Sequence, residues 1–325
     1  MEEINYSFWK NRSVLVTGAA GFLGSQLCAK LADLGSNVRA LIRYNSANSY
    51  GLLDLLPVET QEKIEIYAGD ILDEASLLDP MKDVDVVFHL AAIPSIPYSL
   101  QNPRHVFQVN VQGTTNVLFA AKAASARKVV LASSAGASDK RHPLSPYITS
   151  KAAMEKVGLG FVHGFHRDVT TIRLLNNYGP GQSARAIVPT IISQALERDD
   201  VHLGALDPKL DFTYSGDTIA AFLRTAESGE TPGNILTWGT GSSISVKELA
   251  EQIFKLVGRK GLHIVTDEKR VRKAPGPVAS LEDDIKNTHR ILQLSPHTDL
   301  QTGLQRTIAW IFGNKALYKT GIYNI

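Results

Sequence analysis

The first 175 residues of the chain alternate between two patterns of hydrophobic and polar positions. Short runs rich in β-branched residues recur at residues 13–17, 37–42, 64–67, 84–89, 128–132 and 169–173. Between them, apolar residues recur at helical spacing over residues 22–34, 105–124 and 147–160. Strands that are apolar throughout and alternate with helices are typical of a parallel sheet that helices cover on both faces. The pattern predicts an α/β fold with a doubly wound parallel sheet.

After about residue 176 the regular alternation ends. Helical spacing returns at residues 187–197, 217–228, 246–257 and 300–312, between segments rich in glycine, proline and charge. This pattern predicts a smaller, mixed α/β lobe. Segment 217–238 reads as one helix and one strand that return to the first lobe. We therefore expect a first domain of residues 1–175 with about 215–240, and a second lobe of about 176–214 and 241–325.

Composition narrows the class of protein. The chain has 325 residues, of which 44% are hydrophobic and 20% charged, as in ordinary soluble globular proteins. This apolar content excludes a disordered chain. The net charge of +2 comes from 34 basic and 32 acidic residues. Such a balance argues against nucleic acid or a membrane surface as a partner, but it leaves room for a small anionic ligand.

Cysteine content and apolar run lengths bear on location. The one cysteine, Cys28, excludes an intrachain disulfide and a cysteine-based zinc cage, and no metal site is expected. No apolar run approaches the roughly 20 residues that a membrane span needs. The first residues lack the apolar core of a secretory signal. We expect a cytoplasmic protein without a membrane partner.

Three closely spaced glycines follow the first predicted strand and open the first predicted helix. Gly18 permits a tight turn, Gly21 lets a pyrophosphate approach the backbone, and Gly24 lets the helix pack on the strand. The N-terminus of the helix then faces the phosphate charge. Glycines also collect in ordinary turns, but the strand before and the helix after favour dinucleotide binding in a Rossmann-like fold.

Two residues bear on the cofactor's adenosine half. Asp70 follows the third strand, where its side chain would lie near the adenine; the alternative is a cap for the helix near Glu74. The second strand ends without the acid that usually holds the ribose 2′-hydroxyl in NAD sites. Arg43 could instead pair with a 2′-phosphate, helped by Ser46, or it could be a solvated side chain over the adenine. The segment favours NADP over NAD.

Tyr147 and Lys151 stand four residues apart at the start of a predicted helix, about 6 Å apart along its axis. A nearby ammonium, helped by an oxidised nicotinamide, lowers the pKa of a tyrosine, so Tyr147 is a candidate general base. Ser133 and Ser134 end the fifth strand, where catalytic groups of open sheets gather. A serine hydroxyl there could hydrogen-bond the same substrate oxygen. The alternatives are a solvated helix face for the pair and strand-end capping for the serines.

Together these segments resemble the extended short-chain dehydrogenase/reductase family, and specifically its nucleotide-sugar epimerases and dehydratases. The resemblance covers nearly the whole chain, with matches at residues 17–24, 69–71, 89–92, 110–114, 147–151, 173–182 and 300–310. It implies an enzyme that binds NADP or NAD and a nucleotide-diphosphate sugar. The implied catalytic residues are Tyr147, Lys151 and Ser134.

The resemblance also implies a set of binding residues. Those for the cofactor are Gly18, Ala20, Gly21, Phe22, Leu23, Gly24, Arg43, Asp70, Ile71, Leu90, Ala91, Ala92, Asn110, Ser133, Tyr147 and Lys151. Those for the substrate are Ser134, Asn176 and Arg185.

Residues 43–51 and 182–190 are similar to 4,6-dehydratases of the legionaminic-acid type, which oxidise C4 of a hexose, eliminate water across C5–C6 and return the hydride to C6. Those enzymes carry an elimination acid directly after the strand-end Ser/Thr. Here Ala135, Gly136 and Ala137 follow Ser134, and the only nearby carboxylate is Asp139, later in a shortened loop. The serine–alanine step resembles 4-epimerases instead.

Two arginines that grip the diphosphate in this family are also replaced. Leu210 and Ala274 stand at their positions, with Arg185, Lys209, Arg272 or Lys273 as possible substitutes.

The sequence favours a 4-epimerase and leaves other functions open. A 4,6-dehydratase that uses Asp139 is one alternative, and a net oxidoreductase or a decarboxylase is another. A catalytically idle cofactor-binding or scaffold protein is an alternative of a different class, but an idle site has no need for Tyr147, Lys151 and Ser134 together.

The helices at 105–124 and 147–160 carry more apolar residues than one stripe needs. These residues include Phe107, Val111, Leu118, Met154, Val157 and Phe161. They predict a homodimer paired through these helices across a two-fold axis, as in the family's dimers; the alternative is intrachain core.

Overall fold

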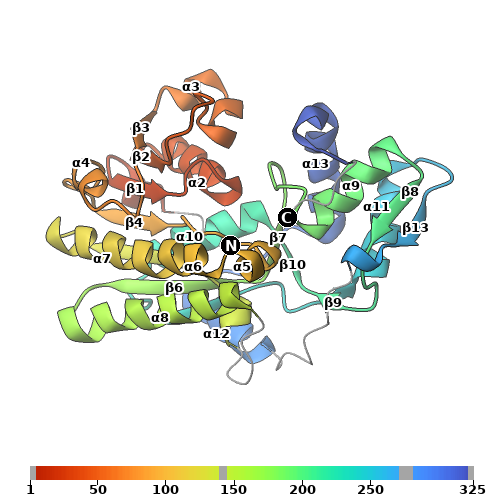
Figure 1. Ribbon diagram of the computed structural model, residues 1–325. Helices are drawn as coiled ribbons and strands as arrows, with labels where there is room; N and C mark the ends of the chain where they lie inside the picture. Colours follow the sequence, from red (N-terminus) through yellow and green to blue (C-terminus); the bar gives the residue numbers. More distant parts are fainter. Residues whose placement is uncertain (1–4, 139–144, 271–280, 321–325) are drawn as a thin grey trace. The chain divides into compact units, whose positions relative to one another are not determined.

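The computed structural model describes residues 5–138, 145–270 and 281–320 (Figure 1). Its contacts divide the chain into two compact units. The first takes in the described parts of Met1–Leu174, Ile219–Trp238 and Asp283–Leu294. The second takes in those of Leu175–Thr218, Gly239–Glu282 and Ser295–Ile325.

A seven-stranded parallel sheet forms the first unit. Its spatial order is β11-β6-β5-β4-β1-β2-β3. The strands are β1 (Ser13–Thr17), β2 (Asn37–Ile42), β3 (Ile64–Ala68), β4 (Val86–His89), β5 (Lys128–Ser134), β6 (Val169–Leu174) and β11 (Ile235–Trp238). The chain order reverses between β1 and β4, and ligands of open parallel sheets bind at such a reversal, outside the carboxyl ends of the strands.

Both faces of this sheet are buried, as the uninterrupted apolar strands require. Val14 and Val16 of β1 belong to one core cluster, and Leu15 between them belongs to the other. α2 (Phe22–Asp33) and α10 (Ser215–Glu227) contribute to the first cluster. α7 (Gly113–Ala123) and α8 (Pro146–Phe165) contribute to the second and run side by side in Figure 1.

The other α-helices of the first unit lie around this core. They are α1 (Tyr6–Trp9), α3 (Val58–Gln61), α4 (Leu78–Met81), α5 (Ile96–Gln101), α6 (Pro103–Phe107) and α12 (Glu282–Leu292). Trp9 of α1 is fully buried, and its Nε1–H donates to Glu227 over 2.6 Å, which ties the start of the chain to α10.

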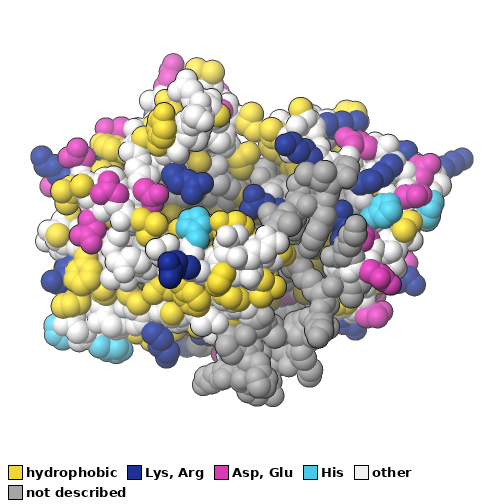
Figure 2. Space-filling view, viewed as in Figure 1, with side chains coloured by type: hydrophobic (Ala, Val, Ile, Leu, Met, Phe, Trp, Pro, Cys, Tyr) yellow, Lys and Arg dark blue, Asp and Glu magenta, His cyan; other side chains and the backbone are white. Residues whose placement is uncertain are grey.

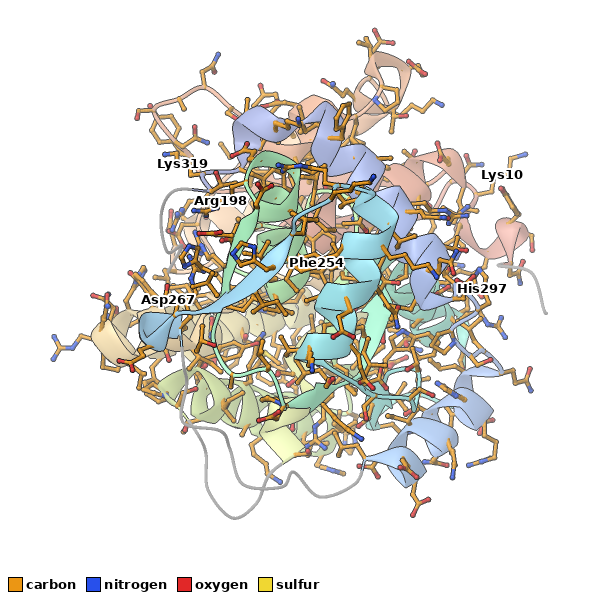
Figure 3. All side chains as sticks on the ribbon, turned by 90° about the vertical axis from the view of Figure 1, so that its right-hand side faces the viewer. Lys10, Arg198, Phe254, Asp267, His297 and Lys319 are labelled. Atoms are coloured by element: carbon orange, nitrogen blue, oxygen red, sulfur yellow. The ribbon has the colours of Figure 1, made fainter. Side chains whose placement is uncertain are left out.

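The second unit combines helices with short two-stranded ladders. The ladders pair β7 (Asn176–Tyr178) with β10 (Phe212–Tyr214), β9 (Lys209–Leu210) with β12 (Ile244–Ser245), and β8 (Asp200–Leu203) with β13 (His263–Thr266). The helices are α9 (Ile187–Glu197), α11 (Val246–Val257) and α13 (Leu300–Gly313). Figure 3 shows Phe254 on α11, and Asp267 directly after β13.

The predicted fold class is confirmed: a Rossmann-like parallel sheet is accompanied by a smaller mixed part. β1 and β2 have the predicted bounds, whereas β5 runs on to Ser134. The single helix predicted over 105–124 is interrupted by a π-helical turn at Gln108–Gln112. Among the described residues, no helix combines the length and the hydropathy that crossing a membrane requires.

One segment lies in a different unit from the one expected. The sequence assigns 241–325 to the second lobe, but Asp283–Leu294 belongs to the first unit. Leu292 is buried in the core cluster of the sheet. The Thr288 hydroxyl accepts the Thr237 N–H of the edge strand over 2.8 Å. These contacts with the sheet place α12 in the first unit, although its neighbours in the sequence belong to the second.

Two glycines of α13 give a matched test of packing in the second unit. A Cβ on Gly303 would lie 2.1 Å from Oη of the fully buried Tyr178. A Cβ on Gly313 would meet nothing within 4 Å. We expect Gly303→Ala to lower the free energy of unfolding by about 1–3 kcal/mol through overpacking. Gly313→Ala should be neutral or slightly stabilising. Urea unfolding of both variants measures the difference, and equal midpoints would contradict the packing at Tyr178.

Candidate active site

The glycine loop between β1 and α2 is built around backbone contacts that exclude side chains. Gly18 has a left-handed φ of 71°. A Cβ at Gly18 would lie 2.7 Å from the Ala91 nitrogen, and one at Gly24 would lie 2.2 Å from the Gly18 oxygen. Gly21 is the N-cap of α2, so no side chain of the cap covers the first N–H groups of the helix. This cradle fits a pyrophosphate at the positive end of the helix dipole.

A directed chain of buried hydrogen bonds starts at the end of β1. The Thr114 hydroxyl donates its one proton to the Asn110 carbonyl oxygen over 2.7 Å. Thr114 must therefore accept from Nε2–H of His89, 2.9 Å away. Nδ1 of His89 then accepts from the Thr17 hydroxyl over 2.7 Å. Burial, helped by the charge of Lys151, lowers the pKa of His89 to about 3, so this histidine stays neutral.

The π-helical turn places Asn110 between the loop after β4 and helix α8. Asn110 is fully buried, and its Oδ1 accepts the Ile93 N–H over 2.8 Å. Its Nδ2 donates to the Ser150 hydroxyl over 2.9 Å, and Ser150 donates to the Tyr147 carbonyl oxygen over 2.7 Å. Asn110 was expected among the cofactor ligands, but the hydrogen bonds of its side chain connect the sheet edge to α8.

Ser134, Tyr147 and Lys151 are brought together at the carboxyl end of β5. Ser145 caps the N-terminus of α8 by accepting the Ile148 N–H over 3.3 Å, and Pro146 occupies the first turn. The Tyr147 hydroxyl and the Ser134 side chain share a hydrogen bond. Nζ of Lys151 donates to the Ala132 carbonyl oxygen over 2.7 Å, two residues before Ser134.

The protonation states differ in part from the sequence-based prediction. The spacing of Tyr147 and Lys151 predicts a lowered tyrosine pKa, but in the structure burial raises the pKa of Tyr147, and only the Ser134 hydrogen bond opposes this. The spacing does not predict this effect of burial, and the lowering of the pKa beside a bound oxidised nicotinamide stays a prediction. Burial also lowers the pKa of Lys151 to about 8, against the charge of Glu155, which raises it.

The other expected cofactor residues of the first unit lie along the same sheet edge. Leu90, Ala91 and Ala92 follow β4, and Arg43 is exposed directly after β2. Asp70 follows β3, and its Oδ1 accepts the Leu72 N–H over 2.9 Å, which closes a local turn.

Two more of the expected residues are committed to contacts within the protein. The Ile71 side chain is buried, and a Cβ on Gly113 would lie 2.5 Å from its Cδ1. The Ser133 hydroxyl donates to Glu155 over 2.6 Å. Ala20, Phe22 and Leu23 belong to the glycine loop and the first turn of α2.

The expected substrate residues Asn176 and Arg185 lie in the second unit, and both are exposed. Nδ2 of Asn176 donates to the Asp211 carbonyl oxygen over 3.0 Å. Leu210 and Lys209 form β9. Asp139, Arg272, Lys273 and Ala274 lie outside the described residues.

The buried ammonium of Lys151 predicts a pH dependence of stability. Its pKa is about 8 in the folded chain and 10.5 ordinarily, so between these values the unfolded state binds more protons. Raising the pH from 8 to 10.5 therefore removes the cost of burying the charge, about 3 kcal/mol. In urea unfolding of cofactor-free protein, the free energy of unfolding of wild type should therefore rise by this amount relative to that of Lys151→Met between pH 8 and 10.5. A constant difference between the two proteins would contradict the burial of a charged Lys151.

The model of the NAD dependent epimerase/dehydratase family matches residues 14–237 of the chain. The chain is 32% identical over 321 residues to the UDP-glucose 4-epimerase of Mycolicibacterium smegmatis, covering 93% of this chain and 99% of that protein. It is 27% identical over 315 residues to the dTDP-D-glucose 4,6-dehydratase of Mus musculus, covering 92% and 88%.

Among solved structures, MoeE5 in complex with UDP-glucuronic acid and NAD is similar, with a TM-score of 0.78 and 29% identity over 93% of this chain and 99% of that chain. Both types of enzyme, epimerase and dehydratase, thus occur among the relatives at similar identity. The family match covers β1 to β11 and includes the glycine loop and the residues Ser134, Tyr147 and Lys151. The chain therefore belongs to the NAD dependent epimerase/dehydratase family, the nucleotide-sugar enzymes of the extended short-chain dehydrogenase/reductases.

Proposed function

We propose that this protein is an NAD-dependent 4-epimerase of a nucleotide-diphosphate hexose. One observation carries the choice of reaction. The hydrogen-bonded pair Ser134–Tyr147 is retained, and the 3₁₀ turn Ala135–Ser138 that follows Ser134 supplies no carboxylate. Elimination of water needs an acid for the departing hydroxyl, whereas inversion at C4 needs only the base that Tyr147 provides.

The residues of the first unit have distinct roles in the proposed reaction. When bound, NAD would supply the acceptor and the donor of the C4 hydride. Tyr147 takes the C4 hydroxyl proton and later gives it back. Ser134 donates a hydrogen bond to the same oxygen, and Lys151 holds the cofactor ribose next to Tyr147. The glycine loop and the N-terminus of α2 hold the pyrophosphate.

For the cofactor we propose NAD rather than the NADP that Arg43 suggests. The family is NAD dependent, and the similar MoeE5 structure contains NAD. Arg43 is exposed after β2, which suits the alternative of a solvated side chain over the adenine. The support for NADP comes from one short segment, where Arg43 and Ser46 stand and the acid of NAD sites is missing.

We infer that the protein forms a homodimer through α7 and α8. Figure 2 shows hydrophobic side chains in a band over these helices. Phe119 and Phe165 are 49% and 42% exposed, and they border a surface hollow of about 560 Å³. Leu118, Met154 and Phe161, which the sequence predicts at this interface, are instead buried in the core of the first unit. A second copy of the chain is the partner that would cover the exposed aromatic rings.

The reaction is tested by incubating the protein and NAD with UDP-, GDP-, CDP- and dTDP-hexoses. We expect a product of unchanged mass with a new anomeric NMR signal. Tyr147→Phe should lower turnover by about 10²–10⁴-fold and leave NAD affinity nearly intact, because only the transferable proton is removed.

The other outcomes separate the alternatives. Loss of the mass of one water would identify a 4,6-dehydratase and point to Asp139. Tight NAD binding without turnover of any sugar nucleotide would favour the idle cofactor-binding protein. Near-normal turnover of Tyr147→Phe would show that Tyr147 is not the catalytic base.

The assembly is tested by light scattering. We expect twice the chain mass of 35.4 kDa for wild type, and one chain mass for Phe119→Glu, because the charge would be buried in the interface. Phe312→Glu is the control, since Phe312 is 62% exposed on α13 and lies outside the proposed interface. A single-chain mass for wild type would refute the dimer.

A further inference from the structure

Glu155 is a buried carboxylate that the proposed mechanism does not use. It lies on α8, eight residues after Tyr147 and four after Lys151, and it is 3% exposed. Positions four apart on a helix share a face, so Glu155 and Lys151 point to the same side of α8. A buried carboxylate is expected to be paired, because an isolated charge is costly to bury.

Three hydrogen bonds from two strands converge on this carboxylate. The Ser133 hydroxyl of β5 donates to Oε1 over 2.6 Å. Nε and Nη2 of Arg173 of β6 donate to Oε1 and Oε2 over 2.8 and 2.7 Å. Ser133 and Arg173 are register partners across the two strands. One side chain of α8 therefore joins the carboxyl ends of β5 and β6, next to Ser134.

The charges around Lys151 are balanced by this arrangement. Lys151 interacts electrostatically with Glu155 on α8 and with His89 on β4, and His89 is neutral. Arg173 on β6 forms an ion pair with Glu155 and is linked to Lys151 through that carboxylate. Removing Glu155 would take away the carboxylate that both Lys151 and Arg173 interact with, and removing Arg173 would leave that carboxylate without its guanidinium partner.

We propose that Glu155 is a positioning residue, which fixes the ends of β5 and β6 against the helix that carries Tyr147 and Lys151 and balances the charge of Arg173 beside Lys151. As far as catalysis is concerned, this inference rests on the proposed function. The geometric part does not, since it concerns the cofactor-free protein.

The chain contains a matched ion pair at the other end of the same two strands. Nζ of Lys128, at the start of β5, lies 3.5 Å from Oδ2 of Asp168, directly before β6. This pair also joins the two strands, but at the edge opposite the candidate site. Asp168→Asn is therefore the control for a loss of strand anchoring as such.

The decisive measurement is the titration of Lys151 in cofactor-free protein, followed by the ¹⁵N resonance of its Nζ and assigned by its absence from Lys151→Met. We expect Glu155→Gln to lower the titration midpoint by about one pH unit or more. Arg173→Met should raise it, because the carboxylate is no longer neutralised. Asp168→Asn should leave the midpoint of Lys151 unchanged and lower that of Lys128, whose pKa Asp168 raises.

Shifts of opposite sign in the two variants cannot come from general loosening, so they would establish the role of Glu155. Unchanged midpoints, or shifts of the same sign, would overturn it. If Glu155→Gln does not fold, the sign of the shift in Arg173→Met decides alone.

Kinetics separate this inference from the proposed function. With a sugar nucleotide that wild type turns over, Glu155→Gln should lower kcat by up to about 100-fold with little change in the KM for the sugar nucleotide, because misplacement of the reacting groups acts on the chemical step. Asp168→Asn should keep the wild-type pH profile of kcat. If wild type turns over no sugar nucleotide, the proposed function fails, and the titration of Lys151 still decides the role of Glu155.

Discussion

Seven parallel strands bring all their carboxyl ends to one edge of the sheet, and the candidate site depends on that constraint. Parallel strands must be connected by crossovers, so each strand end opens into a loop at this edge. The glycine loop, the segment after β4 and the serines of β5 therefore meet there although they are far apart in the chain. Helices buried against both faces hold the strands at fixed spacing, so the positions of these groups are set by the core.

Polar groups at this edge are joined by bonds between different crossovers. Thr17, His89 and Thr114 connect the end of β1 to α7. Asn110 and Ser150 connect the π-helical turn to the first turn of α8. Thr114 donates to the Asn110 carbonyl oxygen, so the glycine loop and the catalytic helix belong to one buried network of hydrogen bonds. Such networks stiffen a site because an unpaired polar group in the interior is costly.

The sequence predicts the parts of this arrangement that depend on local spacing. The glycine loop and the Tyr147–Lys151 pair are recognisable because a turn and a helical repeat dictate them. β1 and β2 are recognisable as uninterrupted apolar runs. The partners of Glu155 are 18 and 22 residues away in sequence, and those of His89 are 72 and 25 residues away. No local pattern reports such pairings. The rise in the pKa of Tyr147 in the cofactor-free protein is missed for a related reason, since desolvation is a property of the packed core.

The direction of the hydrogen bonds through His89 has a consequence for sequence drift. The hydroxyls of Thr17 and Thr114 each have one proton, and each proton is already donated in a hydrogen bond of this series. Replacing Thr17 or Thr114 by valine would keep the shape but strand one nitrogen of the buried imidazole. Replacing His89 would leave the Thr17 hydroxyl without its acceptor and the Thr114 hydroxyl without its donor. The three positions are distant in the chain, but a substitution at one of them is expected to require compensating substitutions at the others. The direction of a few buried hydrogen bonds therefore limits which substitutions this protein tolerates.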